Sequence, residues 1–201
     1  MPAGPSELLI LADNNANSSY IASDLLSQAE HGPDSQVILV SLSQSLINDV
    51  EKCIIDQIKN LDRKDYINKS ILNSKLIFFD NKIEAVEFIN QYAPEHYIIN
   101  VQDESFFIEN IVSAGSVFIG DYSPESAGDY ASGTNHTLPT NGNAKQYSGV
   151  NLDSFLKTIT FQKISKNGLL NISKTVETMA NAEGLQAHKN AVSIRVKDLN
   201  N

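Results

Sequence analysis

The sequence predicts an α/β fold, with a largely parallel sheet and flanking helices, followed by a small helical C-terminal domain. Two observations support this prediction. Short apolar runs alternate with longer segments of helical period from Leu8 to Gly120, which is typical of strands joined by crossover helices. After a polar segment at 121–149, the helical period returns without any strand-like run. We therefore expect an incomplete Rossmann-like domain at 1–149 and a small helical domain at 150–201.

Five apolar runs have the length and boundaries of buried strands, and LLILA, VILVSL and SVFI are examples. Residues that are apolar at successive positions, rather than at every second one, indicate strands that helices cover on both faces, as in parallel sheets. In chain order, the strands are expected at 8–12, 36–42, 76–79, 97–101 and 116–119.

The segments between these runs have the spacing of helices, which are expected in chain order at 19–30, 45–61, 83–92 and 104–111. Gly32 and Pro33 end the first helix. In the second, helical spacing makes Cys53 a small core residue, and a single cysteine cannot form an intrachain disulfide. Three further helices have no strand partner, so we expect them to pack on the sheet domain or on another chain; they lie at about 152–162, 169–182 and 187–196.

The charge of the chain excludes some classes of partner. It has 201 residues, with 15 Lys and Arg against 24 Asp and Glu, and a net charge of −9. This field repels nucleic-acid phosphates and anionic lipids. The apolar runs are shorter than the roughly 20 residues that span a bilayer, and no basic residue precedes the first run as in a secretory signal. We expect a cytoplasmic protein without nucleic-acid or membrane partners, and its abrupt entry into a strand is typical of a segment of a longer protein.

Two pairs of polar residues at element ends have both a chemical and a structural interpretation. Gln28 and His31 are three apart at the end of a helix, so they share one face. The alternative, which this stretch alone favours, is a surface histidine that offsets the helix dipole. Glu95 and His96 follow an Ala-Pro pair and precede a strand. They could form an acid/base couple in one pocket if the backbone kinks there, or be a loop carboxylate and a half-buried imidazole.

The stretch SAGDYASGTNHTLPT contains Asp129 and His136 and has almost nothing to bury. Turn chemistry explains each residue singly. The whole segment 121–149 is nevertheless too long for an ordinary connection, so we expect a bound ion or ligand to order it. The tyrosines of this segment are expected to be packing anchors rather than catalysts: Tyr122, Tyr130 and Tyr147.

Near the C-terminus, Glu183 and His188 flank a helix break at Gly184. They could converge on one point or cap two helices, and these residues alone favour the caps. The imidazoles, Gln28 and the nearby carboxylates could supply a mixed nitrogen and oxygen ligand set, which suits Zn²⁺. Widely spaced single ligands are a weak motif, and no GxGxxG dinucleotide fingerprint is present.

Five motifs, in this order and separation, resemble the C-terminal half of histidinol dehydrogenase over 2–196: PAGPSE, DLLSQAEHGPDSQ, APEH, SAGDYASGTNHTLPT and AEGLQAHKNAV. The resemblance implies oxidation of L-histidinol through the aldehyde to L-histidine with two NAD⁺, at a site with one Zn²⁺. It implies that Glu95 and His96 are the acid/base pair. The zinc ligands that it implies are Gln28, His31, Asp129 and His188. The substrate contacts that it implies are these ligands, His96, Ser6, His136 and Glu183.

The resemblance further implies a homodimer with a shared active site, to which the partner subunit supplies Glu183 and His188. The N-terminal half of the family, which supplies most NAD contacts, has no counterpart in this sequence. We therefore expect a truncated or fragment form, with weak or no dehydrogenase activity of its own. One alternative is a non-catalytic zinc-binding remnant that lacks the NAD site. A metal-dependent hydrolase that uses Glu95 and zinc-bound water is compatible with the residue types, but the motifs disfavour it.

Overall fold

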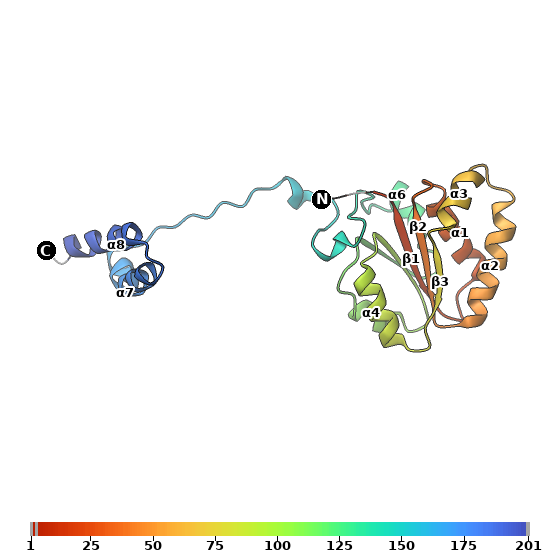
Figure 1. The fold of residues 1–201 in the computed structure, drawn as a ribbon, viewed down its shortest axis with the longest axis horizontal. Helices are drawn as coiled ribbons and strands as arrows, with labels where there is room; N and C mark the ends of the chain where they lie inside the picture. The colour runs from red at the N-terminus through yellow and green to blue at the C-terminus, as the bar shows by residue number, and fades with distance from the viewer. Residues whose placement is uncertain (1, 3, 200–201) are drawn as a thin grey trace. The chain divides into compact units, whose positions relative to one another are not determined.

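Five parallel strands form the central sheet of the computed structural model, which describes Pro2 and residues 4–199 (Figure 1). The strand order 3-2-1-4-5 is that of a Rossmann-type sheet up to its fifth strand. The predicted α/β class is confirmed, and every strand begins and ends within one residue of its expected range. In spatial order the strands are β3 (Lys75–Phe78), β2 (Gln36–Ser41), β1 (Glu7–Ala12), β4 (His96–Asn100) and β5 (Ser116–Ile119).

Helices cover both faces of this sheet (Figure 1). On one face lie α1 (Ser18–Ala29), α2 (Gln44–Ile58) and α3 (Lys64–Ile71). On the other face lie α4 (Lys82–Tyr92) and α5 (Glu104–Glu109). Helix α3, which buries Ile67 and Ser70, was not predicted from the sequence, because its eight residues are fewer than the window over which a helical period becomes clear.

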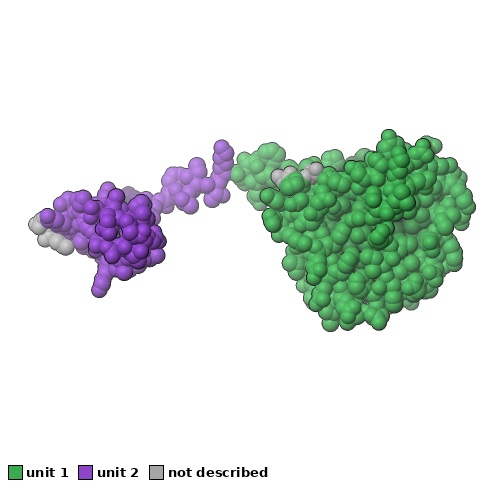
Figure 2. Space-filling model, viewed as in Figure 1, with its two compact units in different colours: residues 1–156 green, residues 157–201 purple. Residues whose placement is uncertain are grey.

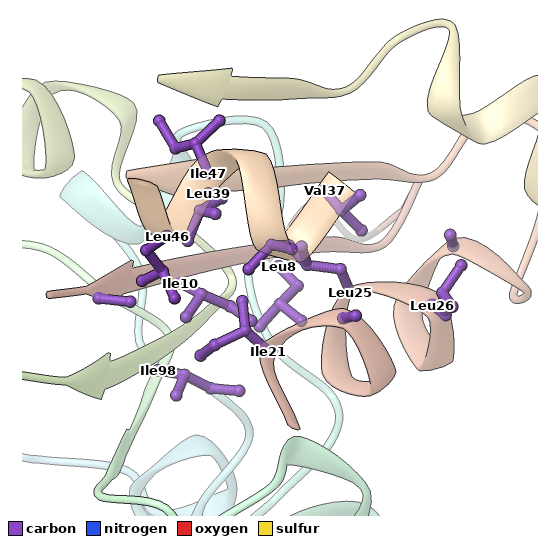
Figure 3. Close-up of a cluster of buried hydrophobic side chains, with 14 of the residues drawn as sticks. Leu8, Ile10, Ile21, Leu25, Leu26, Val37, Leu39, Leu46, Ile47 and Ile98 are labelled. Atoms are coloured by element: carbon purple, nitrogen blue, oxygen red, sulfur yellow. The ribbon is translucent and has the colours of Figure 1, made fainter. Parts of the chain in front are cut away.

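The central strand β1 shows why the apolar runs are continuous. Side chains alternate between the two faces of a strand. Leu8 and Ile10 belong to the cluster that α1 and α2 cover (Figure 3), whereas Leu9 and Leu11 belong to the cluster under α4. All six residues of β1 are buried, so an alternating apolar pattern would leave polar groups inside the core.

The chain has two compact units, residues 1–156 and residues 157–201 (Figure 2). In the second unit, α7 (Lys166–Ala182) packs against α8 (Gln186–Leu199), and Ser193 Oγ donates to Glu177 Oε1 at 2.5 Å. Gly184 joins the two helices in a left-handed conformation, with φ 74°. Helices at two of the three expected places, 169–182 and 187–196, are therefore present.

The prediction of a helix at 152–162 is wrong. The structure has a short 3-10 helix there, η2 (Leu152–Phe155), and neither helix nor strand at 157–165. Ile159 and Phe161 are 69% and 92% exposed, so a helix here would have no apolar face to bury. Within the described part of the chain, no helix combines the length and the apolar content that a bilayer crossing requires.

Candidate active site

A pocket of about 360 Å³ lies at the amino-terminal ends of β1 and β4. Ligands of doubly wound sheets usually bind beyond the carboxyl ends of the strands, whereas this pocket is formed by segments at the opposite end. Six of the predicted site residues come together here. The lining residues are Gly4, Ser6, His31, Glu95, His96, Asp129, His136, Thr137 and Leu138.

Glu95 and His96 both face this pocket because the backbone turns sharply just before them. Ala93, the residue that ends α4, is left-handed, with φ 56° and ψ 65°. Pro94 follows it and cannot continue the helix. The Ser116 N–H then donates to the Glu95 carbonyl at 2.9 Å and fixes the turn to the start of β5. The kink that an acid/base couple requires is therefore present, with Glu95 4% and His96 3% exposed.

The main chain of Glu7, at the start of β1, holds both members of this pair. Its N–H donates to Glu95 Oε2 at 2.8 Å, and its carbonyl oxygen lies 3.0 Å from His96 Nδ1. Because a carbonyl can only accept, the neutral imidazole must carry its hydrogen on Nδ1, which leaves a lone pair on Nε2. Nε2 is buried and has no hydrogen-bond partner among the residues that the structure describes. His96 therefore offers a proton acceptor that is held in place and otherwise unused.

The burial of the pair adjusts its proton affinities. Burial lowers the pKa of His96, against the opposing effects of the Glu7 carbonyl and Asp129. Burial, together with the nearby carboxylates of Glu7 and Asp129, raises the pKa of Glu95 to about 8 against the opposing effect of the Glu7 N–H bond. A neutral imidazole beside a carboxyl group that titrates near neutral pH is suited to general acid/base chemistry.

The short helix α6 (Glu125–Tyr130) brings two carboxyl groups close to His31. Glu125 and Asp129 are four residues apart and so lie on one side of this helix. One donor atom from each of Glu125, Asp129 and His31 lies within 4.8 Å of the others. One end of the Gln28 amide, on α1, lies 2.5 and 3.0 Å from the two Glu125 carboxylate oxygens, and it is assigned as the nitrogen because only a donor can form hydrogen bonds there.

This donor cluster fits a divalent cation. Glu95, Glu125 and Asp129 lie close together, and the lysine ion pairs of the described residues all lie elsewhere. Burial, together with Asp129 and Glu95, raises the pKa of Glu125 to about 9, which indicates that no positive charge among the described residues compensates these carboxyl groups. A bound cation would supply that charge, and imidazole with carboxylate and amide oxygens suits Zn²⁺.

The segment 121–149 has more internal structure than the sequence indicates. Besides α6, it contains the 3-10 helix η1 (Asn143–Lys145), and it buries Leu138 and Thr140. Asn141 N–H donates to Glu7 Oε1 at 2.6 Å. The expectation that the stretch 126–140 has almost nothing to bury is therefore wrong for its C-terminal end, which protein contacts hold in place. An ordering effect of zinc or substrate near Asp129 and His136 stays a prediction.

Sequence reasoning missed two residues of the site. Glu125 follows a proline and resembles an ordinary residue of a first helical turn, and only its spacing of four from Asp129 indicated a shared face. Glu7 acts mainly through its backbone, which no sequence pattern reveals. The predicted anchoring role of the tyrosines is wrong for Tyr122 and Tyr130, which are 88% and 87% exposed.

Two further predicted site residues lie in the second compact unit. Glu183 is the residue that ends α7, and His188 lies in the first turn of α8; both are exposed. Their contribution to zinc and substrate binding stays a prediction.

Gly128 allows α6 to lie against β5. A Cβ atom at this position would lie 2.5 Å from the Phe118 ring and 2.6 Å from Thr134 Oγ1. Gly128→Ala is therefore expected to displace α6 together with its two carboxyl groups and to destabilise the first unit by about 1–3 kcal/mol. Thermal unfolding and zinc titration test this, with Ser126→Ala, an exposed position on the same helix, as control. Equal behaviour of the two variants would contradict this account of Gly128.

The fold and the pocket together define an α/β protein with enzyme-like chemistry, in which a buried acid/base pair adjoins a donor set that fits a divalent cation. The sequence model of the histidinol dehydrogenase family matches residues 1–196. The chain therefore belongs to the histidinol dehydrogenase family, a family of oxidoreductases, and the resemblance that the motifs indicate is confirmed.

The relatives match nearly the whole chain. It is 56% identical over 200 residues to chloroplastic histidinol dehydrogenase of Arabidopsis thaliana, covering 99% of this chain and 43% of the relative. It is 54% identical over 200 residues to a putative bifunctional histidine biosynthesis protein of Photorhabdus laumondii, covering 100% and 25%. The crystal structure of histidinol dehydrogenase from Elizabethkingia anophelis matches with a TM-score of 0.94 and 53% identity, covering 100% and 46%. The chain thus spans less than half the length of these relatives.

Proposed function

We propose that this chain provides the zinc-binding and substrate-binding part of an enzyme of histidine biosynthesis, which oxidises L-histidinol through the aldehyde to L-histidine and passes hydride to NAD⁺. The observation that carries the proposal is the pocket itself, because a base with a free ring nitrogen and a nitrogen and oxygen donor set occur side by side. In this proposal the zinc ligands are Gln28, His31, Asp129 and His188.

The chain's own groups would move the protons. His96 Nε2 would accept the hydroxyl proton of the alcohol as hydride leaves the same carbon, and its Nδ1–H bond to the Glu7 carbonyl would keep the ring oriented. Glu95 would then take a proton from the water that adds to the aldehyde, which gives the hydrate for the second oxidation. Ser6 and His136, which both line the pocket, would position the substrate. Zinc, when bound, would orient histidinol through its imidazole and amine nitrogens.

Calorimetric titration of L-histidinol into the chain with and without zinc, followed by measurement of NADH in the same samples, tests this function. The expected result is binding that requires zinc. NADH formation would show a complete nicotinamide site, whereas its absence would favour the alternative of a substrate site without a complete NAD site in this chain. Failure of histidinol to bind with or without zinc would contradict the proposal.

We further propose that the site is shared in a homodimer, with Glu183 and His188 reaching the pocket of the partner subunit. His188→Ala is then expected to lower zinc occupancy, because one nitrogen ligand is lost. Metal content after dialysis against a fixed zinc concentration measures the effect. His136→Ala, which leaves the proposed ligands intact, is the control, and unchanged occupancy in His188→Ala would contradict the ligand assignment.

A further inference from the structure

The contact between Gln28 and Glu125 joins α1 to α6, close to the pocket residues His31 and Asp129. Both side chains are buried, Gln28 at 0% and Glu125 at 2% exposure. With its nitrogen toward Glu125, the Gln28 amide donates to Oε1 at 2.5 Å and to Oε2 at 3.0 Å. The opposite orientation would place the amide oxygen against the two carboxylate oxygens. Neither an amide oxygen nor a carboxylate can donate a hydrogen bond, so no bond would form. Glu125 in its ionised form, which a nearby cation favours, therefore selects one of the two orientations of the amide.

This selection has a consequence for metal binding. A primary amide has two different ends, because its oxygen has lone pairs for a cation while its nitrogen only donates hydrogen bonds. When the nitrogen is engaged by Glu125, the oxygen is the end that remains free. We propose that Glu125 is a positioning residue that fixes the Gln28 amide so that Oε1 faces the cation; this inference rests on the proposed function, in which Gln28 is a zinc ligand.

A competing role for Glu125 is that of a direct ligand, since its carboxylate lies within 4.8 Å of donor atoms of His31 and Asp129. The contacts of its two oxygens favour positioning. Both oxygens of Glu125 already accept from the Gln28 amide, and its Oε1 also lies 3.7 Å from His96 Nδ1. Outer groups that orient metal ligands in this way typically change metal affinity by about 10- to 100-fold when removed.

Exchange of the two residues separates these roles. The zinc affinity of the full chain is measured by competition with a chromogenic chelator for wild type, Glu125→Gln, and the double variant Gln28→Glu with Glu125→Gln. Glu125→Gln is expected to bind zinc about 10- to 100-fold more weakly, because an amide pair permits either orientation of Gln28. The double variant is expected to recover most of this loss, since the carboxylate at position 28 presents an oxygen to zinc while the amide at position 125 donates to it.

Each outcome distinguishes a positioning role of Glu125 from a role as a direct zinc ligand. A double variant that binds as weakly as Glu125→Gln would show that the carboxylate is needed at position 125 itself, and would overturn the positioning role while leaving the zinc site intact. Unchanged affinity in Glu125→Gln would overturn it as well. Absence of zinc binding by the wild-type chain would overturn the proposed zinc site together with this inference. Glu30→Gln, which removes the same charge just after α1, is the control and is expected to bind like wild type.

A readout without metal checks the contact directly. In the metal-free chain labelled with ¹⁵N, the side-chain amide of Gln28 is expected to exchange slowly with solvent, because both donors are buried and one faces Glu125. In Glu125→Ala this protection is expected to fall at least tenfold while backbone amides of β1 and β4 keep theirs. Equal protection of the Gln28 amide in both proteins would contradict the contact.

Discussion

Asp129→Asn is expected to lower the zinc affinity of the chain by about 100-fold or more, since the loss of a ligand should exceed the 10- to 100-fold effect of losing an outer group. The substitution keeps the shape of the side chain but replaces a negatively charged carboxylate by a neutral amide. One oxygen of this carboxylate lies within 4.8 Å of metal-binding atoms of His31 and Glu125. His31→Ala is expected to have an effect of similar size, because it removes the nitrogen donor that the first unit contributes.

Competition with a chelator of known affinity measures both variants. Asp34→Asn is the matched control, since it removes the same charge from an exposed position only three residues from His31. If Asp34→Asn weakened binding as much as Asp129→Asn, the effect would reflect the overall charge of the surface and not a site. Wild-type affinity in Asp129→Asn would remove Asp129 from the ligand set.

The free energy of unfolding of the metal-free chain is expected to fall as pH rises from about 6.5 to about 9.5. Burial raises the pKa of Glu95 to about 8 and that of Glu125 to about 9 in the folded protein, from an ordinary value of 4.5. The folded state therefore binds more protons than the unfolded state between the ordinary and the raised pKa, and its stability falls with pH across that window. Above the raised pKa the loss is complete.

The choice of pH range isolates the effect of these two carboxyl groups. Burial lowers the pKa of His96 below its ordinary 6.5, which destabilises the fold only on the acid side, so measurements above that pH exclude it. Each pKa unit corresponds to about 1.4 kcal/mol, so a loss of about 2 kcal/mol or more is expected over the range, equivalent to at least ~4 °C in Tm.

The variant Glu125→Gln tests the origin of this pH dependence. It removes one of the two buried carboxyl groups with a raised pKa, so the slope of the pH profile is expected to decrease and the stability at pH 9 to rise above that of wild type. Glu51→Gln on α2, an exposed position, is expected to leave the profile unchanged. A wild-type slope in Glu125→Gln would show that the dependence arises from other groups.

Most of the sheet could be predicted from the sequence because its central strands are buried on both faces. LLILA is apolar at every position and VILVSL at every position except Ser41, and such runs match the strands to within one residue. Helix α6 could not be predicted in the same way. It has six residues, contains Gly128, and is held by packing of that glycine against Phe118, a tertiary contact that leaves no periodic pattern.

The residues of the site also divide into those that nearby sequence indicates and those that only the tertiary fold reveals. The motif around Gln28 and His31 indicated a shared helix face, and the Ala-Pro pair before Glu95 indicated a kink, since both depend on residues close in the sequence. The role of Glu7 depends on pairing of β1 with β4, because only that register brings its N–H and carbonyl to Glu95 and His96. The helix expected at 152–162 was wrong because a helical period in the sequence does not ensure burial, and Phe161 is 92% exposed.

Anomalous scattering at the zinc absorption edge, from crystals of the chain grown with zinc, tests the central claim most directly. The account predicts one strong peak in the pocket, in contact with His31 and Asp129 and with the oxygen of the Gln28 amide. A peak elsewhere, or a pocket without zinc in crystals that contain zinc at other sites, would contradict the assignment of these residues as a metal site.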